Sequence, residues 1–238
     1  SKKILLLNMK KINFFGIIPA RSGSQSVKNK NIKLLNGKPL IYWTIKAAKE
    51  SKMLNNFIVS TNSEKISKIA KSFGAPIPYL RPNNLAKSDT TMISVVKNVI
   101  ENIKNIKDYD AIVLLPPTTP LRTSVDIDKA CKLFIKNKPD SLIGVTEVKH
   151  TNNPNSLFNL KEKNYMEYVY NVKKIYKKQN KKKYYASNSS IYITKLSKSK
   201  KYIIGGKMTG YLMSILKSID IDSMEEFILA ESLMKYNI

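Results

Sequence analysis

The sequence predicts an α/β fold in which a mostly parallel sheet carries helices on both faces. Short apolar runs alternate with longer runs of helical periodicity over roughly the first 145 residues, which is the rhythm of βαβ units. Polar loops follow the apolar runs, as expected where parallel strands end. With 238 residues, of which 42% are hydrophobic, the chain is long enough to bury one large core.

The first strand is expected at residues 12–18, where Phe14, Phe15, Ile17 and Ile18 show no alternation between core and water. Such a run is typical of a parallel strand that is buried on both faces. The same reasoning, applied along the chain, predicts helices at 39–51, 64–73, 91–104 and 125–137, and strands at 57–60, 77–80, 111–115 and 141–145.

The rhythm fails between residues 150 and 183, a segment rich in Asn, Lys and Tyr. A stretch of this length is either an inserted arm for interactions or a long loop, and its length favours the arm. Strand character returns at 190–194 and near 208–214, and the last helix is expected at 224–236. We therefore expect a single domain over residues 9–238 with an arm inserted at 150–183.

The net charge of +25 is typical of proteins that bind nucleic acids, since clustered cations bind phosphate backbones. Only three of the 42 basic residues are arginines, and the lysines are spread over nearly every segment. A dispersed lysine surface is better explained by solvation than by a binding stripe. We therefore expect no nucleic-acid partner, and the scarce arginines, Arg21, Arg81 and Arg122, become candidates for specific roles.

Cysteine use and hydropathy bear on location. The single cysteine, Cys131, cannot form a disulfide within the chain, which fits a reducing cytoplasm. The first 20 residues resemble a secretion signal, but Lys10 and Lys11 interrupt the apolar run and leave too short a hydrophobic region. No later run of 18 uncharged apolar residues occurs, so we expect a cytoplasmic protein without a membrane span.

The loop after the first strand, residues 21–31, consists almost entirely of hydrogen-bond donors. Its cations and polar side chains suit a polyphosphate, and Gly23 lets backbone N–H groups approach a ligand closely. Taken alone, the segment fits a solvated turn better than a ligand loop. The donors of this loop include Arg21, Ser22, Ser24, Gln25, Ser26, Lys28 and Lys30.

Two carboxylates near the C-terminus, Asp220 and Asp222, alternate with isoleucines in the sequence SIDIDS. On an extended segment, residues two apart lie on the same side, so both carboxylates can face one cation. Mg²⁺ prefers such oxygens together with those of a phosphate. The alternative is that Asp222 or Ser223 caps the last helix, and the two roles are compatible.

Two further loops place arginines after expected strands. The sequence LLPPTTPLRT presents small hydroxyl residues between prolines, and Arg122 behind them can make a bidentate contact with an anion. The sequence YLRPNNLAKSDTT places Arg81 after a strand and Ser88 before a helix. Neither loop is specific by itself.

A series of segments resembles a known family in both order and spacing. They are IIPARSGSQSVKNKN, NGKPLI, VSTNSE, RPNNLAKSDT, LLPPTTPLR, SNSSIYI and SIDID. The family comprises the cytidylyltransferases that activate nine-carbon acid sugars, namely the acylneuraminate (CMP-sialic acid) synthetases and their legionaminate and pseudaminate relatives. The resemblance extends from about Ile12 to the end of the chain, so it is far more specific than a single motif.

The resemblance implies a Rossmann-like nucleotidyltransferase fold of the GT-A-like type, with a protruding arm that forms a homodimer. It also implies that CTP and an acid sugar react to give the CMP-sugar and pyrophosphate, with Mg²⁺ as cofactor. Such products serve lipopolysaccharide, capsule or other glycan biosynthesis.

Roles for individual residues follow from the same resemblance. Asp220 and Asp222 are implied to hold Mg²⁺, and Lys30 and Asn31 to close the loop around the triphosphate. Arg81 and Ser88 are implied to line the nucleotide side. The triphosphate is implied to contact Arg21, Ser22, Gly23, Ser24 and Gln25. The acid sugar is implied to contact Lys178, Gln179, Asn188 and, unless it only braces its loop, Arg122.

The chain departs from the family at five positions. The family usually has Lys-Gly where this chain has Gln25 and Ser26, so a cation is missing unless Lys28 or Lys30 replaces it. It usually has Asp in place of Asn62, Gln in place of Pro116, and Arg in place of Lys178. Three alternatives stay open: a related enzyme for another base or ulosonic acid, a catalytically weak nucleotide-binding paralogue suggested by Gln25, Asn62 and Pro116, and a basic nucleic-acid-binding protein, which the dispersed lysines disfavour.

Overall fold

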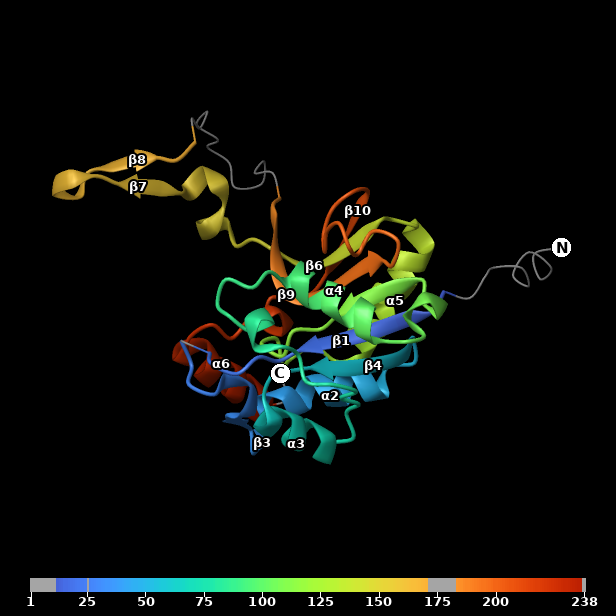
Figure 1. Cartoon of the computed structure of the whole chain (residues 1–238). Coiled ribbons are helices and arrows are strands. Elements are labelled where there is room, and N and C mark those ends of the chain that lie inside the picture. Colours follow the sequence, from blue (N-terminus) through green and yellow to red (C-terminus); the bar gives the residue numbers. More distant parts are fainter. Residues whose placement is uncertain (1–11, 25, 171–182, 237–238) are drawn as a thin grey trace.

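The structure of the protein is a computed structural model that describes residues 12–24, 26–170 and 183–236. Its centre is a six-stranded sheet in the order β10-β6-β9-β5-β1-β4 (Figure 1). Strand β9 is antiparallel to both neighbours, and all other neighbouring pairs are parallel. The sheet is therefore mostly parallel, as the sequence predicted. The strands are β1 (Phe14–Pro19), β4 (Leu54–Ser60), β5 (Ala111–Leu114), β6 (Ser141–Glu147), β9 (Tyr185–Lys195) and β10 (Met208–Leu212).

Helices cover both faces of this sheet, which confirms the predicted fold class. Side chains alternate along β1, so Phe14 and Ile18 enter one core cluster while Phe15 and Ile17 enter the other. The first cluster contains α2, α3 and α5, and the second contains α4. These helices are α2 (Leu40–Glu50), α3 (Glu64–Ser72), α4 (Met92–Asn102) and α5 (Ser124–Asn137).

A smaller third cluster lies beside the sheet, where α6 (Met224–Lys235) packs near the short strands β2 (Leu34–Leu35) and β3 (Lys38–Pro39). Ile219 and Ile221 both belong to this cluster, as their alternation with the aspartates predicted. Single 3₁₀ turns complete the described chain: η1 (Lys30–Ile32), η2 (Asn83–Leu85), η3 (Ile106–Asp108), η4 (His150–Asn152), η5 (Pro154–Ser156), η6 (Glu162–Asn164) and η8 (Leu216–Ser218).

The strand expected at residues 77–80 is absent, and this prediction was wrong. The segment is hydrogen-bonded to the backbone of the β4 region at its two ends, through Val59 N–H to Pro76 O (3.0 Å) and Arg81 N–H to Thr61 O (2.7 Å). Pro76, Pro78 and Pro82 lack the N–H donors that a strand ladder requires. The chain therefore crosses beside β4 as an extended linker, and Arg81 is still delivered to the carboxyl end of the sheet.

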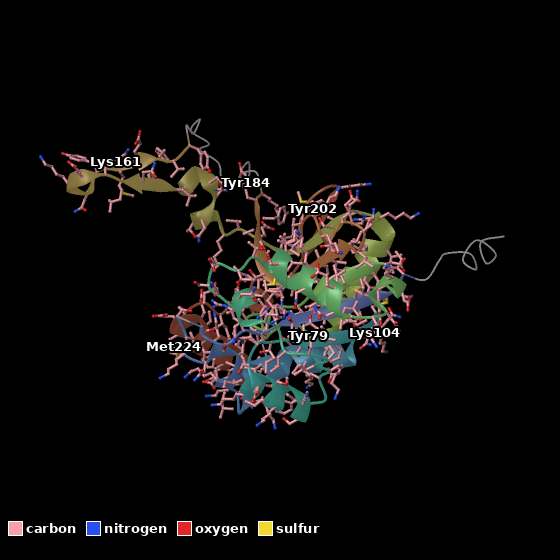
Figure 2. The ribbon with its side chains drawn as sticks, viewed as in Figure 1. Tyr79, Lys104, Lys161, Tyr184, Tyr202 and Met224 are labelled. Carbon is pink, nitrogen blue, oxygen red and sulfur yellow. The ribbon has the colours of Figure 1, made fainter. Side chains whose placement is uncertain are left out.

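The segment that breaks the rhythm leaves the sheet as a hairpin. Strands β7 (Phe158–Leu160) and β8 (Met166–Tyr168) pair antiparallel and extend away from the body of the protein (Figure 1). Lys161, which belongs to the hairpin, lies far from Tyr79 and Lys104 in the body of the protein (Figure 2). Among the helices of the described ranges, none combines the length and apolar character that crossing a bilayer requires.

Candidate active site

A cleft of about 240 Å³ lies at the carboxyl ends of β1 and β5, where the predicted loops converge. Its walls come from the loop after β1, the segment 81–95 and the loop that follows β5. Parallel sheets place ligand sites at this edge. The cleft gathers the predicted residues Arg21, Ser24, Lys30, Asn31 and Arg81.

The charge of the lining indicates an anionic ligand. Arg21, Lys30, Arg81 and Lys87 line the cleft, and its lining includes no carboxylate. Four cations around one cavity repel one another unless an anion lies between them. Lys87 was not predicted, although it directly precedes the predicted Ser88 in the same loop. Ser88 itself is exposed and lies outside the lining.

Arg81 is the most buried of these cations, with only 3% of its surface exposed. Its Nε has no hydrogen-bond partner within the described residues. Burial lowers its pKa most, Arg21 lowers it further, and Tyr79 partly opposes them. Since a buried guanidinium N–H without an acceptor is costly, an anionic ligand would satisfy it.

The loop after β1 is held by its neighbours. Asn31 Nδ2 donates to Arg21 O (2.9 Å), and Arg21 Nη1 donates to Ala86 O (3.4 Å) across the cleft. Gly23 has a φ of 76°, a conformation that side chains disfavour. Ser22 and Gly23 are exposed and lie outside the lining. Gln25 lies outside the described residues.

Lys30 connects this loop to the SIDID segment. It is buried, and its Nζ donates to Ile221 O (2.5 Å) and to Asp222 Oδ1 (3.1 Å). Ile221 N–H in turn donates to Thr118 O (2.8 Å), and Thr118 lines the cleft. The aspartate segment is therefore held next to the cation-lined cleft by two contacts, one with Lys30 and one with Thr118.

Asp220 and Asp222 have side chains suited to a hard cation. Asp220 Oδ1 is buried and has no hydrogen-bond partner within the described residues, whereas the Asp222 side chain is 76% exposed. Ser223 caps α6 in a capping box with Glu226, so neither aspartate side chain is used as the cap. Across the described ranges no three His, Cys, Asp or Glu side chains form a metal-binding group. A cation here would need further oxygens from phosphate and water, as Mg²⁺ commonly does.

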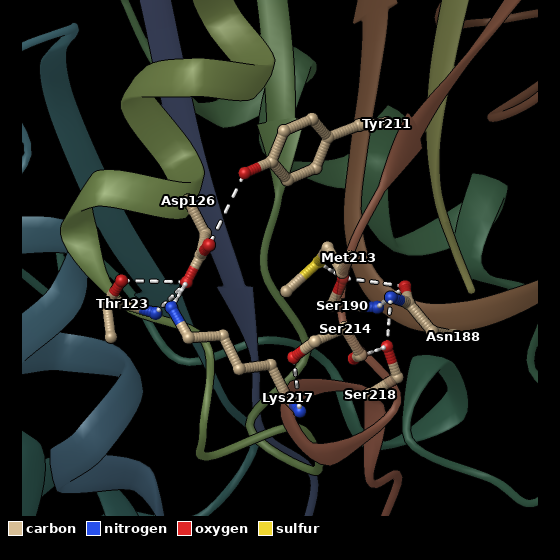
Figure 3. Close-up of polar contacts among 9 residues, drawn as sticks. All are labelled: Thr123, Asp126, Asn188, Ser190, Tyr211, Met213, Ser214, Lys217 and Ser218. Atoms are coloured by element: carbon tan, nitrogen blue, oxygen red, sulfur yellow. Dashed lines mark hydrogen bonds and ion pairs between the residues drawn. The ribbon is translucent and has the colours of Figure 1, made fainter. Parts of the chain in front are cut away.

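Asn188, predicted to face the acid sugar, is 3% exposed and fixed by internal contacts (Figure 3). Its Nδ2 donates to Ser218 Oγ (2.9 Å), and its Oδ1 accepts from Ser190 N–H and Oγ–H (3.2 and 2.7 Å). Gly144 makes room for it, since a Cβ there would lie 2.5 Å from Asn188 Oδ1. The other two residues predicted for the sugar, Lys178 and Gln179, lie outside the described residues.

Arg122 braces the loop after β5. Its Nη1 donates to Pro116 O, Thr119 Oγ1 and Ser190 O, and its Nη2 donates to Thr44 Oγ1, all within 3.2 Å. Burial lowers its pKa to about 9, while Asp126 opposes the shift. The bracing alternative thus accounts for its terminal nitrogens, and direct contact with substrate stays a prediction. Sequence alone could not separate the two roles, because both use the same side chain after the same strand.

Comparisons with known proteins find similarity over nearly the whole chain. The family model described as Cytidylyltransferase matches residues 15–237. The chain is 35% identical to the post-translational flagellin modification protein B of Campylobacter coli, covering 92% of this chain and 93% of that protein. It is 30% identical to the CMP-N,N'-diacetyllegionaminic acid synthase of Legionella pneumophila, covering 95% and 98%.

The chain is also similar to a longer enzyme and to a solved structure. The N-acylneuraminate cytidylyltransferase of Escherichia coli is 33% identical over 90% of this chain, which spans 50% of that longer protein. Among solved structures, CMP:2-keto-3-deoxy-manno-octonic acid synthetase complexed with CTP aligns with a TM-score of 0.70 at 13% identity, covering 95% of this chain and 100% of that one, and so supports the fold. With a family model that matches nearly the whole chain and relatives that share about a third of its residues, the protein belongs to the cytidylyltransferase family.

Proposed function

We propose that the protein transfers CMP from CTP to a nine-carbon 2-keto-3-deoxy acid sugar of the sialic acid type, for use in glycan biosynthesis. The observation that carries this proposal is the cleft lined by four cations and no carboxylate, at the carboxyl edge of a cytidylyltransferase sheet. Relatives named for legionaminic, pseudaminic and neuraminic acids support an acid sugar as the acceptor.

In the proposed reaction, the anomeric hydroxyl oxygen of the sugar attacks the α-phosphorus of CTP. A new P–O bond forms, the bond from the α-phosphorus to the bridging oxygen breaks, and pyrophosphate leaves with that electron pair. The hydroxyl proton passes to water or to an aspartate carboxylate. Such a transfer depends on positioning and on neutralising charge rather than on covalent help from the protein.

The residues around the cleft would share these tasks. Arg21, Lys30 and Lys87 would neutralise the triphosphate, and the buried Arg81 would find its acceptor there. Ser24, Asn31 and Gln25 would add neutral donors to the same phosphates. Lys178 and Gln179 would position the acid sugar, whose carboxylate needs a cation, and the buried Asn188 would act through its contact with Ser218.

Asp220 and Asp222 would hold Mg²⁺, for which the unpartnered Asp220 Oδ1 is a suitable ligand. When bound, the ion would neutralise charge on the phosphate oxygens. Lys30 already contacts Asp222 and lines the cleft, so it would keep the aspartate segment next to the phosphates.

Two broader properties belong to the same proposal. The hairpin β7–β8 would serve as the arm of a homodimer, because it extends from the body and exposes apolar side chains. A cytoplasmic location fits Cys131, which is buried and forms no disulfide.

The test is a pyrophosphate-release assay that combines each nucleoside triphosphate with sialic, legionaminic, pseudaminic and eight-carbon ulosonic acids. We expect release with CTP and a nine-carbon acid, and a product whose mass equals that of the CMP-sugar. Preference for another base or for the eight-carbon acid would identify a related enzyme. Binding of CTP without turnover on any acid would favour the weak paralogue.

Two exposed lysines offer a matched comparison of the cleft itself. Lys87 lines the cleft, whereas Lys104 lies beyond the end of α4 and is not among the residues of the lining. Lys87→Ala should weaken CTP binding about tenfold, because a charge-assisted contact to phosphate is lost. Lys104→Ala should leave binding unchanged. Equal effects of the two variants in calorimetry would place CTP elsewhere.

A further inference from the structure

Asn62 joins two loops that are distant in the sequence and that both contribute residues to the lining of the cleft. Its Oδ1 accepts from Ser22 N–H (3.0 Å), and its Nδ2 donates to Ser22 Oγ (2.9 Å) and to Asn83 Oδ1 (3.0 Å). Ser22 directly follows Arg21, and Asn83 lies two residues after Arg81. One amide therefore links the segments that carry both arginines of the cleft.

The residues on either side of Asn62 hold it on a rigid support. Thr61 is fully buried at the end of β4, and its carbonyl oxygen accepts from Arg81 N–H (2.7 Å). Its Oγ1 accepts from Ser63 N–H (3.1 Å), and Ser63 caps α3 by accepting from Ile66 N–H. Because a strand end and a helix cap fix the backbone, the amide of Asn62 has little freedom to follow the loops.

The link made by Asn62 joins the segments of two arginines whose charges repel each other. Arg21 and Arg81 both line the cleft, and their like charges repel in the absence of a ligand. Ser22 is exposed, and its backbone N–H is used by Asn62 rather than offered to a ligand. This explains why Ser22, predicted as a phosphate contact, lies outside the lining.

We propose that Asn62 is a positioning residue that clasps the loop after β1 to the 81–90 loop, and so holds Arg21 and Arg81 at the separation a nucleoside triphosphate requires. The proposal rests on the proposed function and adds to it a residue that touches no substrate. Pre-setting the two walls removes an ordering cost from binding. Loss of the clasp should therefore weaken the binding of CTP more than that of the acid sugar.

The experiment measures the dissociation constant of CTP by calorimetry for the full chain and for the variants Asn62→Ala, Asn83→Ala and their double mutant. We expect about tenfold weaker binding for Asn62→Ala, about threefold for Asn83→Ala, and no further loss in the double mutant, because both changes open the same clasp. The KM for CTP should rise in parallel, while the KM for the acid sugar stays unchanged.

Asn137→Ala is the matched control, since Asn137 is exposed at the end of α5 and its side-chain amide donates to Thr209 Oγ1 (3.4 Å). It should bind CTP like the wild type. The clasp is refuted if Asn62→Ala binds CTP within twofold of the wild type, or if the two single effects add in the double mutant. A wild type that binds no CTP would instead overturn the proposed function, so the two failures are distinguishable.

Discussion

Asp222 is the residue for which chemistry and stability are best separated. Its side chain is 76% exposed, and in the described structure it pairs only with the buried Lys30, whose Nζ keeps a second acceptor in Ile221 O. Because one partner is exposed and the other keeps an acceptor, the pair contributes on the order of 1 kcal/mol. We expect Asp222→Ala to abolish pyrophosphate release while the melting temperature changes little. In calorimetry, Mg²⁺ should tighten CTP binding by the wild type but not by the variant.

The control is Asp108→Ala, an exposed aspartate in η3 outside the cleft lining, which should keep full activity. If Asp222→Ala releases pyrophosphate at a normal rate in Mg²⁺, the metal assignment is wrong.

At the residue scale, the sequence located cations better than it located neutral contacts. Lys30 was found because it belongs to the donor-rich loop after β1, which ends at the binding edge of the sheet. Arg81 was found through the family resemblance of its segment, although the strand expected before it is absent. The role of Asn62 could not be read, because its partners lie 40 and 21 residues away and meet only in the fold. The polar network of Asn188 likewise needs the neighbouring Gly144 of β6, which sequence spacing does not reveal.

Individual elements were predictable to the extent that their signals are local. The helices were placed within about one or two residues, since Ser63, Thr91 and Ser223 cap them with side chains that a sequence displays. The prediction of a strand at 77–80 was wrong because it weighed the apolar and aromatic residues and ignored the prolines among them. The antiparallel direction of β9 depends on the route of the chain through the hairpin, which no local pattern encodes.

The start of α5 carries a carboxylate whose charge should matter for stability. Burial alone would raise the pKa of Asp126, but hydrogen bonds from Thr123 and Lys217 outweigh it and hold the pKa below its ordinary value (Figure 3). Because the pKa is lower in the folded state, the charged carboxylate stabilises the fold at pH values above the pKa of the unfolded state. This contribution is lost as the pH falls through the pKa of the folded state.

We therefore expect Asp126→Asn to lower the free energy of unfolding by about 2 kcal/mol at pH 7, the range of a hydrogen bond to a charged group. The gap between wild type and variant should shrink below about pH 4, near the ordinary pKa of aspartate. Urea unfolding at several pH values measures it. A gap that stays constant down to pH 3 would show that the charge of Asp126 is not responsible.

For the whole molecule, the open question is what covers the hairpin β7–β8. Its cross-strand pairs Phe158–Tyr168 and Leu160–Met166 lie on one face, and all four side chains are exposed. The other face carries Asn159 opposite Glu167. Glu167 Oε2 forms an ion pair with Lys161 Nζ (2.8 Å). A two-stranded hairpin with one bare apolar face is marginal in water by itself. A second copy of the chain would supply the missing contact.

We expect light scattering at micromolar concentration to give twice the chain mass of 27.1 kDa. Leu160→Lys should shift the protein toward monomer, because it places a charge in the centre of the apolar face, where interface cores exclude charged residues. Asn159→Lys changes the neighbouring residue on the polar face and should leave the dimer intact. A wild type of monomeric mass would contradict the arm, and equal dissociation by both variants would show that the hairpin acts through its overall charge rather than through its apolar face.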